Sequence, residues 1–221
     1  MKKFKLTKKT KEHFGITLYQ IKALKAFNDV KKGEKGGWIE KEGNLSQKNN
    51  AWVYGNARVS GDAWVYGNAK IFDNARVSGN AEVYDDAEVY DDARVFDNAE
   101  IYDNVEIYGD AWVYGNAWIY GDAWVYGNAK IFRDAHISGD AKISGDAKIS
   151  GKLKLIGGCF YHYKKKEEKI EHIEINEDYE LLACNPKLED EKSDEVEDKV
   201  EEAINLLKHK GYKIIKLNDK P

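Results

Sequence analysis

An aliphatic residue recurs at every sixth position from residue 53 to residue 155 and begins each of eighteen copies of a repeat. The fifth position of the repeat is small and nearly always Ala, with Val105, Leu153 and Cys159 as the exceptions. The third and fourth positions are mostly Gly or Asp followed by Asn or Asp. Because these residues tolerate tight turns and positive φ, each copy is predicted to form a short strand and a corner.

A six-residue unit cannot bury its aliphatic side chain alone, so neighbouring units must stack into a solenoid with a continuous core. The repeat resembles that of the hexapeptide-repeat proteins, which form a left-handed parallel β-helix with three repeats in each triangular coil. The resemblance implies a mainly β protein of about six to seven coils. Its left-handed winding is taken from the family and not from the spacing. With strands ~4.8 Å apart, six coils extend over roughly 29 Å.

Changes in composition divide the chain into three parts. Residues 1–36 are predicted to form an N-terminal cap, residues 37–160 the β-helix, and residues 161–221 a small C-terminal α+β domain. The stretch at 16–27 is ambiguous between strand and helix. Ile39 and Leu45 keep the phase of the repeat, which predicts a degenerate first coil.

The entry segment resembles the N-termini of uncharacterised hexapeptide-repeat proteins of phages, prophages and bacteria. The matching residues are L-Y-Q-I-K-A-L at 18–24 and G-G-W-I-E at 36–40, and the resemblance covers roughly residues 16–158. It implies a viral or prophage origin and brings no established activity. A purely structural interpretation is also open, because the end of a solenoid exposes unpaired backbone groups that a cap would cover.

The C-terminal part is predicted to fold as β-β-α-β. Apolar residues at 169–176 and 179–184 indicate two strands joined by a short acidic turn. A helix is signalled by Ser193 and two acids at its start, by apolar residues at helical spacing, and by basic residues before Gly211. Residues 212–217 would form the last strand. This domain would cap the second end of the solenoid or bind a partner.

The formal net charge of −4 argues against generic nucleic-acid binding, although local stripes can still bind anions. The basic start of the chain has no apolar run behind it. We therefore expect neither a signal peptide nor a membrane anchor, and we place the protein in the cytoplasm of a bacterial host. Cys159, at the small inward position, and Cys184, in an apolar run, are expected to be core residues.

The residues on either side of each aliphatic position point outward, since side chains alternate along a strand. Positions eighteen residues apart then lie above one another and form three outer columns. The first column, aromatic with an acidic middle, consists of Trp52, Tyr54, Lys70, Phe72, Glu88, Tyr90, Glu106, Tyr108, Trp124, Tyr126, Lys142 and Ser144. The cationic column consists of Arg58, Ser60, Arg76, Ser78, Arg94, Phe96, Trp112, Tyr114, Lys130, Phe132, Lys148 and Ser150. The third column consists of Trp64, Tyr66, Glu82, Tyr84, Glu100, Tyr102, Trp118, Tyr120, His136, Ser138, Lys154 and Ile156.

Stacked like charges repel, so the ladder of Arg58, Arg76 and Arg94 is most simply explained by facing carboxylates or by a bound anion. Closed threefold assembly uses heterologous contacts, in which one face meets a different face of the next subunit. Hexapeptide-repeat proteins are commonly trimers, and the resemblance therefore also implies a homotrimer. The carboxylates that a neighbouring subunit would supply are those of Glu82, Glu88, Glu100 and Glu106.

One coil has two large aromatic residues on each face and lies beside a cationic band. Such residues stack on nucleobases and bind phosphates, which makes them a candidate site for a host protein or a nucleotide-like small molecule. Two other interpretations stay open: the rings stabilise adjacent strands, or a trimer buries them. The candidate residues are Trp112, Tyr114, Trp118, Tyr120, Trp124, Tyr126, Lys130, Arg133 and His136.

Many hexapeptide-repeat proteins are CoA-dependent acyltransferases, which generally use a His base near a subunit interface. His136, the only histidine of the repeat region, would be the catalytic base in that case alone. The zinc carbonic anhydrases of this fold use three histidines, and the repeat offers no comparable set. Corner Asp residues can attract Ca²⁺ but usually serve turns. We expect no metal and no cofactor.

The near-identical repeats favour a noncatalytic binding protein over a cleft with individually placed catalytic groups. Together with the phage-like resemblance, this predicts a phage accessory protein that counters host defence by capturing a host protein or a nucleotide signal. The alternatives are a CoA-dependent acyltransferase and a structural or virion solenoid.

Overall fold

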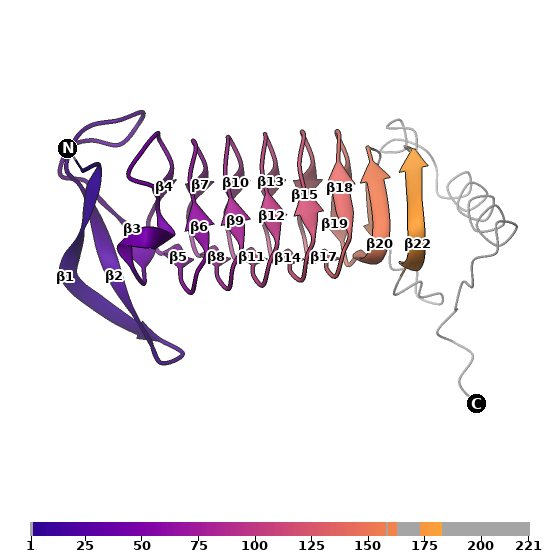
Figure 1. Cartoon of the computed structure of the whole chain (residues 1–221), viewed down its shortest axis with the longest axis horizontal. Coiled ribbons are helices and arrows are strands. Elements are labelled where there is room, and N and C mark those ends of the chain that lie inside the picture. Colours follow the sequence, from indigo (N-terminus) through magenta and orange to yellow (C-terminus); the bar gives the residue numbers. More distant parts are fainter. Residues whose placement is uncertain (1, 158, 163–172, 183–221) are drawn as a thin grey trace, which may run out of the picture.

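The structure is a computed structural model that describes residues 2–157, 159–162 and 173–182. In this part of the chain, short parallel strands form three ladders, and each strand pairs with strands of the coils before and after it. Figure 1 shows the coils in a row along one axis. The predicted β-solenoid is therefore confirmed, with about seven turns. Its left-handed winding stays a prediction.

Each ladder carries one of the three outer columns. The first ladder consists of β4 (Trp52–Val53), β7 (Lys70–Ile71), β10 (Glu88–Val89), β13 (Glu106–Ile107), β16 (Trp124–Val125), β19 (Lys142–Gly145) and β21 (Cys159–His162). The second carries the cationic column and consists of β3 (Lys35–Ile39), β5 (Arg58–Val59), β8 (Arg76–Val77), β11 (Arg94–Val95), β14 (Trp112–Val113), β17 (Lys130–Ile131) and β20 (Lys148–Ile156). The third consists of β6 (Trp64–Val65), β9 (Glu82–Val83), β12 (Glu100–Ile101), β15 (Trp118–Ile119) and β18 (His136–Ser138). The last of these pairs with the end of β20, whose start pairs with β17.

An antiparallel hairpin extends the second ladder at its N-terminal end (Figure 1). β1 (Phe4–His13) pairs with β2 (Ile16–Ala23), and β2 pairs with β3. Of the stretch at 16–27 with ambiguous periodicity, residues 16–23 thus form a strand. Three residues of β2, Leu18, Ile21 and Ala23, are buried, and their burial favours the strand because isolated hairpins are only marginally stable.

Aromatic rings and one lysine close the N-terminal end of the core. The rings of Phe4 and Phe27 meet the buried Trp52 edge-on, with centroids 6.1 and 5.4 Å away. Lys3 is fully buried, and its Nζ donates to the carbonyl oxygens of Ala51 at 2.8 Å and of Lys48 at 3.2 Å. Burial lowers the pKa of Lys3 to about 8.

The degenerate first coil exists, but its phase differs from the prediction. Ile39 pairs with Val59 and Leu45 with Val65, and in each pair the two residues are separated by two positions more than the repeat's spacing of 18. The prediction that Ile39 and Leu45 keep the phase is therefore wrong by two residues. The longer coil contains a short 3₁₀ helix, η1 (Glu42–Asn44). No helix among the described residues is long and apolar enough to span a membrane.

The phase also moves at the C-terminal end of the solenoid. In β21, Phe160 pairs with Ile143 and Cys159 with the outward Lys142. Phe160 packs against the core, while Cys159 is only half-buried. The prediction of Cys159 as an inward core residue is therefore wrong, because the chain reaches the inward position one residue earlier than the repeat requires.

β22 (Ile173–Leu182) lies beside β20 and is parallel to it (Figure 1). This single strand passes through positions 177–178, where the sequence predicted a turn between two strands, so the hairpin prediction is wrong there. The acidic stretch coincides with a register shift, since Ile175 pairs with Gly151 and Tyr179 with Leu153. The predicted helix at 193–210, the strand at 212–217 and Cys184 lie outside the described residues.

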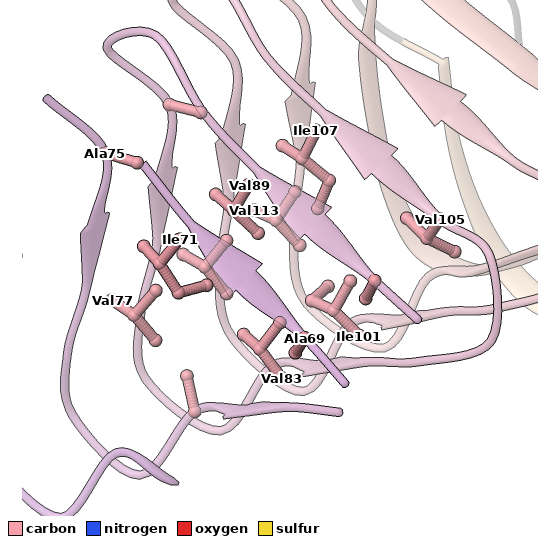
Figure 2. Packing of buried hydrophobic residues seen from close by; sticks show 14 of the residues in the cluster. Ala69, Ile71, Ala75, Val77, Val83, Val89, Ile101, Val105, Ile107 and Val113 are labelled. Carbon is pink, nitrogen blue, oxygen red and sulfur yellow. The ribbon is translucent and has the colours of Figure 1, made fainter. Parts of the chain in front are cut away.

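The core is built from the first and fifth positions of the repeat. Figure 2 shows aliphatic side chains such as Ile71, Ile101 and Val113 directed into the interior between the ladders. All three side chains are fully buried, and so are nearly all of the small Ala residues between them. Burying one such aliphatic side chain contributes about 1.5–3 kcal/mol. Backbone bonds between coils, such as Arg76 N–H to the Ala93 carbonyl at 2.9 Å, hold the stack together.

Candidate functional site

The strand register confirms the three columns predicted from the repeat. The prediction that every column residue is exposed is wrong at the two ends, where Trp52 is fully buried against Phe4 and Phe27 and Ser138, Ser144 and Ser150 are buried. In the second ladder, Arg58 pairs with Arg76, Arg76 with Arg94, and Arg94 with Trp112. The ladder then continues to Lys130 and Lys148. Because each column is one ladder of a rigid stack, its side chains form a flat surface with fixed spacing.

The arginines of the cationic column have no carboxylate partner within ion-pair distance among the described residues. The salt bridges in this part of the chain are Lys2–Glu42, Lys41–Asp62 and Lys70–Glu88. Burial lowers the pKa of the Arg76 guanidinium, and repulsion from its neighbours Arg94 and Arg58 lowers it further. The nearby Asp92 offsets only part of this repulsion, so the column carries positive charge without an ion-pair partner among the residues that the structure describes.

The N-terminal hairpin adds further nitrogen-bearing side chains to this surface. Nζ of Lys11 lies 4.3 Å from the ring centroid of Trp38, and Nζ of Lys9 lies 5.3 Å from it. His13 lies over Arg58, with Nη1 of Arg58 2.9 Å from Nδ1 of His13. Sequence analysis missed this contribution, although the alternation of Lys9, Lys11 and His13 along a strand places them on one face.

The acidic candidates make contacts within their own columns. Glu88 forms an ion pair with Lys70 at 2.7 Å. Glu82 accepts a hydrogen bond from the Tyr66 hydroxyl at 3.0 Å, and Glu106 accepts one from the Tyr90 hydroxyl at 2.8 Å. No ion pair or hydrogen bond of the Glu100 carboxylate is present among the described residues.

Burial raises the pKa of Glu100, and the neighbouring Glu82 raises it further. In the third ladder, Glu100 pairs directly with Glu82 on one side and with Trp118 on the other. The acidic part of the third column therefore carries unrelieved repulsion, opposite in sign to that of the cationic column.

Stacked aromatic ladders run along all three columns. Neighbouring rings are nearly parallel, with centroids 4.6 Å apart for Tyr66 and Tyr84 and 5.0 Å apart for Tyr114 and Phe132. Stacking of this kind stabilises adjacent strands. Because each inner ring lies between two others, the ladders offer ring edges to solvent. The inner rings are Tyr84, Tyr90, Tyr102, Tyr108 and Tyr114.

The three tryptophans of the candidate aromatic coil lie on three different ladders, in β14, β15 and β16. The nine candidate residues therefore do not form one site within a protomer. The structure does bring together Trp118 with His136, stacked at 5.1 Å, and Trp124 with Lys142, whose Nζ lies 5.0 Å from the ring centroid. Trp118 and Trp124 are 39% and 37% exposed.

Trp112 lies between two cations of its own column. The guanidinium of Arg94 and Nζ of Lys130 each lie 4.7 Å from a Trp112 ring centroid. Each contact is a cation–π interaction. A nucleobase could stack on the Trp112 ring only by displacing the Arg94 or the Lys130 side chain. Arg133, the remaining basic candidate, lies at a corner with φ of 62° and its guanidinium 5.8 Å from the Phe132 ring.

Comparison with known families supports the fold. A family model described as the YdcK beta solenoid repeat matches residues 51–67, which span most of the first regular coil. The chain is a β-solenoid repeat protein. That description names a structural repeat and says nothing of phages. No curated protein shows significant similarity to the chain.

The corner aspartates of this β-solenoid have a structural role. Asp91, Asp97 and Asp103 adopt positive φ between 56° and 61°. Their carboxylates accept hydrogen bonds from backbone N–H groups one coil further on; the Gly109 N–H, for example, donates to Asp91 at 3.1 Å. Asp in this conformation is favoured because its side chain can bond locally.

Proposed function

We propose that this β-solenoid is a noncatalytic binding scaffold whose cationic column pairs with the third column of a neighbouring copy, in a closed ring of three. The observation that supports this is the match of charges coil by coil. Arg76 and Glu82 belong to one coil, and Arg94 and Glu100 belong to the next. Copies with parallel axes and equal height would therefore place Arg76 and Arg94 opposite glutamates, whereas Arg58, one coil earlier, would lie opposite Trp64.

The first column fits the cationic column less well. With coils matched in the same way, the first column would bring Lys70 opposite Arg76 and Glu88 opposite Arg94. Lys70 and Glu88 already form an ion pair with each other. A heterologous contact between two different faces closes into a ring of three when it relates neighbouring copies by a third of a turn. With the cationic and third columns used in this way, the first column would face outward and leave Trp124 for another partner.

The electrostatics of the separate columns favour the same pairing. The lowered pKa of Arg76 and the raised pKa of Glu100 both mean that the charged form is disfavoured where it stands. An opposite charge across an interface favours the charged form of both groups. Charge complementarity of this kind fixes register and suppresses wrong partners.

The pairing would be confined to the N-terminal half of the solenoid. The last regular coil has a lysine on every column, namely Lys142, Lys148 and Lys154. Like charges would face each other there, whereas Trp112 would face Trp118 in the coil after the arginines. We therefore expect an interface that covers the two Arg–Glu coils and ends at the coil that contains Trp112 and Trp118.

A charge swap tests the proposed pairing. Arg94→Glu and Glu100→Arg are each expected to weaken association by about tenfold or more, because each variant places like charges opposite each other. The double variant, which restores opposite charges, is expected to recover the mass of the wild type in sedimentation equilibrium. The matched control is Glu106→Arg on the first column, which should leave assembly unchanged. Single variants that assemble normally, or a double variant that does not recover, would refute the pairing.

No particular observation favours the acyltransferase alternative. His136, its predicted base, stacks on Trp118 within the third column. The phage accessory role and the capture of a host protein or nucleotide stay predictions that rest on the resemblance of the entry segment.

A further inference from the structure

We infer that the N-terminal hairpin and the first regular coil form a binding site for a small multivalent phosphate, such as diphosphate or the phosphates of a nucleotide. Lys9, Lys11, His13 and Arg58 would hold it. The inference rests on the proposed binding function and names a ligand class for it. The site differs from the coils that pair with a neighbouring copy and from the aromatic coil singled out in the sequence.

The geometry gathers four nitrogen-bearing side chains around one step of the second ladder. Trp38 of β3 pairs with Arg58 of β5 and is almost completely buried, so its ring is a fixed platform. The ammonium groups of Lys11 and Lys9 lie 4.3 and 5.3 Å from the centre of that ring. His13 lies over Arg58, with ring nitrogens 2.9 and 3.2 Å from Nη1.

The cluster lacks a compensating anion. Among the described residues, no carboxylate lies within ion-pair distance of Lys9, Lys11, His13 or Arg58. Burial and the charges of neighbouring Arg58, Arg76 and Lys9 lower the pKa of Lys11 to about 8. Burial, Arg58, Arg76 and Lys11 likewise lower the pKa of His13. Burial is the larger cause of both shifts, and the neighbouring positive charges lower both pKa values further.

Arg58 also has an unsatisfied donor. Its Nε is buried and has no hydrogen-bond partner. Buried donors are nearly always paired, and an exception calls for an explanation such as a missing ligand or water. Here the exception belongs to Arg58, one of the four residues of the cationic cluster.

A multivalent phosphate fits this cluster better than a single carboxylate does. Phosphate groups have several acceptor oxygens and more than one negative charge, so they can bridge an Arg guanidinium and two Lys ammonium groups at once. The donors come from two strands of one sheet, β1 and β5, and not from a flexible loop. Such preorganisation lowers the entropy lost on binding.

Isothermal titration of the full chain with inorganic diphosphate at neutral pH and physiological salt tests the inference. We expect one saturable site per chain, and we expect Lys11→Gln and Arg58→Gln each to weaken binding by about tenfold. Lys9→Gln alters an exposed side chain and serves as a second variant if Arg58→Gln unfolds. Lys11→Arg, which keeps the charge, should retain binding. The matched control is Lys148→Gln, at the far end of the same column, which should bind like the wild type.

The inference is overturned if the wild type shows no saturable binding of diphosphate, or if Lys148→Gln weakens that binding as much as Lys11→Gln does. It is also overturned if an oligoglutamate peptide binds more tightly than diphosphate through the same residues, because the ligand would then be a carboxylate and not a phosphate. The assembly variants separate this inference from the proposed pairing. If Arg94→Glu fails to assemble but still binds diphosphate, the site stands independently; if the wild type assembles but binds none, the phosphate site alone fails.

Discussion

Ile101→Ala is expected to lower the free energy of unfolding by about 3–4 kcal/mol, because it removes a fully buried side chain and leaves a cavity. The cavity would not collapse easily. Ile101 lies in a ladder between Val83 and Ile119, and backbone bonds to both neighbouring coils fix its strand. Because each coil contacts only its neighbours, the loss would also weaken the coupling between the two halves of the stack.

Urea unfolding followed by circular dichroism measures this loss, at one protein concentration so that assembly contributes equally to each variant. The matched control is Ile101→Val, expected to cost about 1 kcal/mol, since Val83 already occupies the equivalent position in the preceding coil. A cost for Ile101→Ala no larger than that of the control would contradict the packed interior.

Gly67→Val is expected to destabilise the solenoid by about 3 kcal/mol, since a β-branched residue in the left-handed region is strongly strained. Gly67 has φ of +66°, and a Cβ there would lie 2.6 Å from the backbone nitrogen of Asp85 in the next coil. The corner could accept the side chain only if the coils moved apart. Thermal unfolding measures the effect.

Gly67→Asn is the control for that corner. The equivalent positions one and two coils further on are Asp85 and Asp103, with φ of 53° and 59°, so this row of corners already accepts a short polar residue. Asn would bring the same close Cβ contact with Asp85 but tolerates positive φ, so we expect Gly67→Asn to cost at least about 1 kcal/mol less than Gly67→Val. Equal destabilisation by Asn and Val would show that space alone, and not backbone conformation, limits the corner.

The regular part of the fold could be predicted from the sequence because one period fixes both the core and the surface. A spacing of eighteen residues predicts that Arg58 lies beside Arg76 and Glu88 beside Glu106, and both pairs are confirmed. Side-chain alternation then separates the buried valines and isoleucines from the outer columns. No tertiary information beyond the repeat is needed for these statements.

The two ends could not be predicted in the same way, because the period fails there. Leu45 pairs with Val65 only after two additional residues, and Phe160 reaches Ile143 one residue early. Neither change has a signature in the local pattern, since both depend on how the chain enters and leaves the stack.

The candidate sites likewise include features that the repeat predicts and features that it does not. The repeat places the three tryptophans of the aromatic coil at consecutive strands, and consecutive strands belong to different faces. The cluster of Lys11, His13 and Arg58 joins the hairpin to the first regular coil across more than forty residues of sequence. Such a contact follows from the path of the hairpin, which no periodicity describes.

The mass of the wild-type chain in solution tests the central claim most directly. Native mass spectrometry and sedimentation equilibrium at micromolar concentration should give three times the 25.2 kDa of one chain. Raised salt should weaken the assembly, because the proposed contacts between Arg76, Arg94 and their glutamate partners are electrostatic. A monomer or a dimer at that concentration would contradict the proposed ring of three.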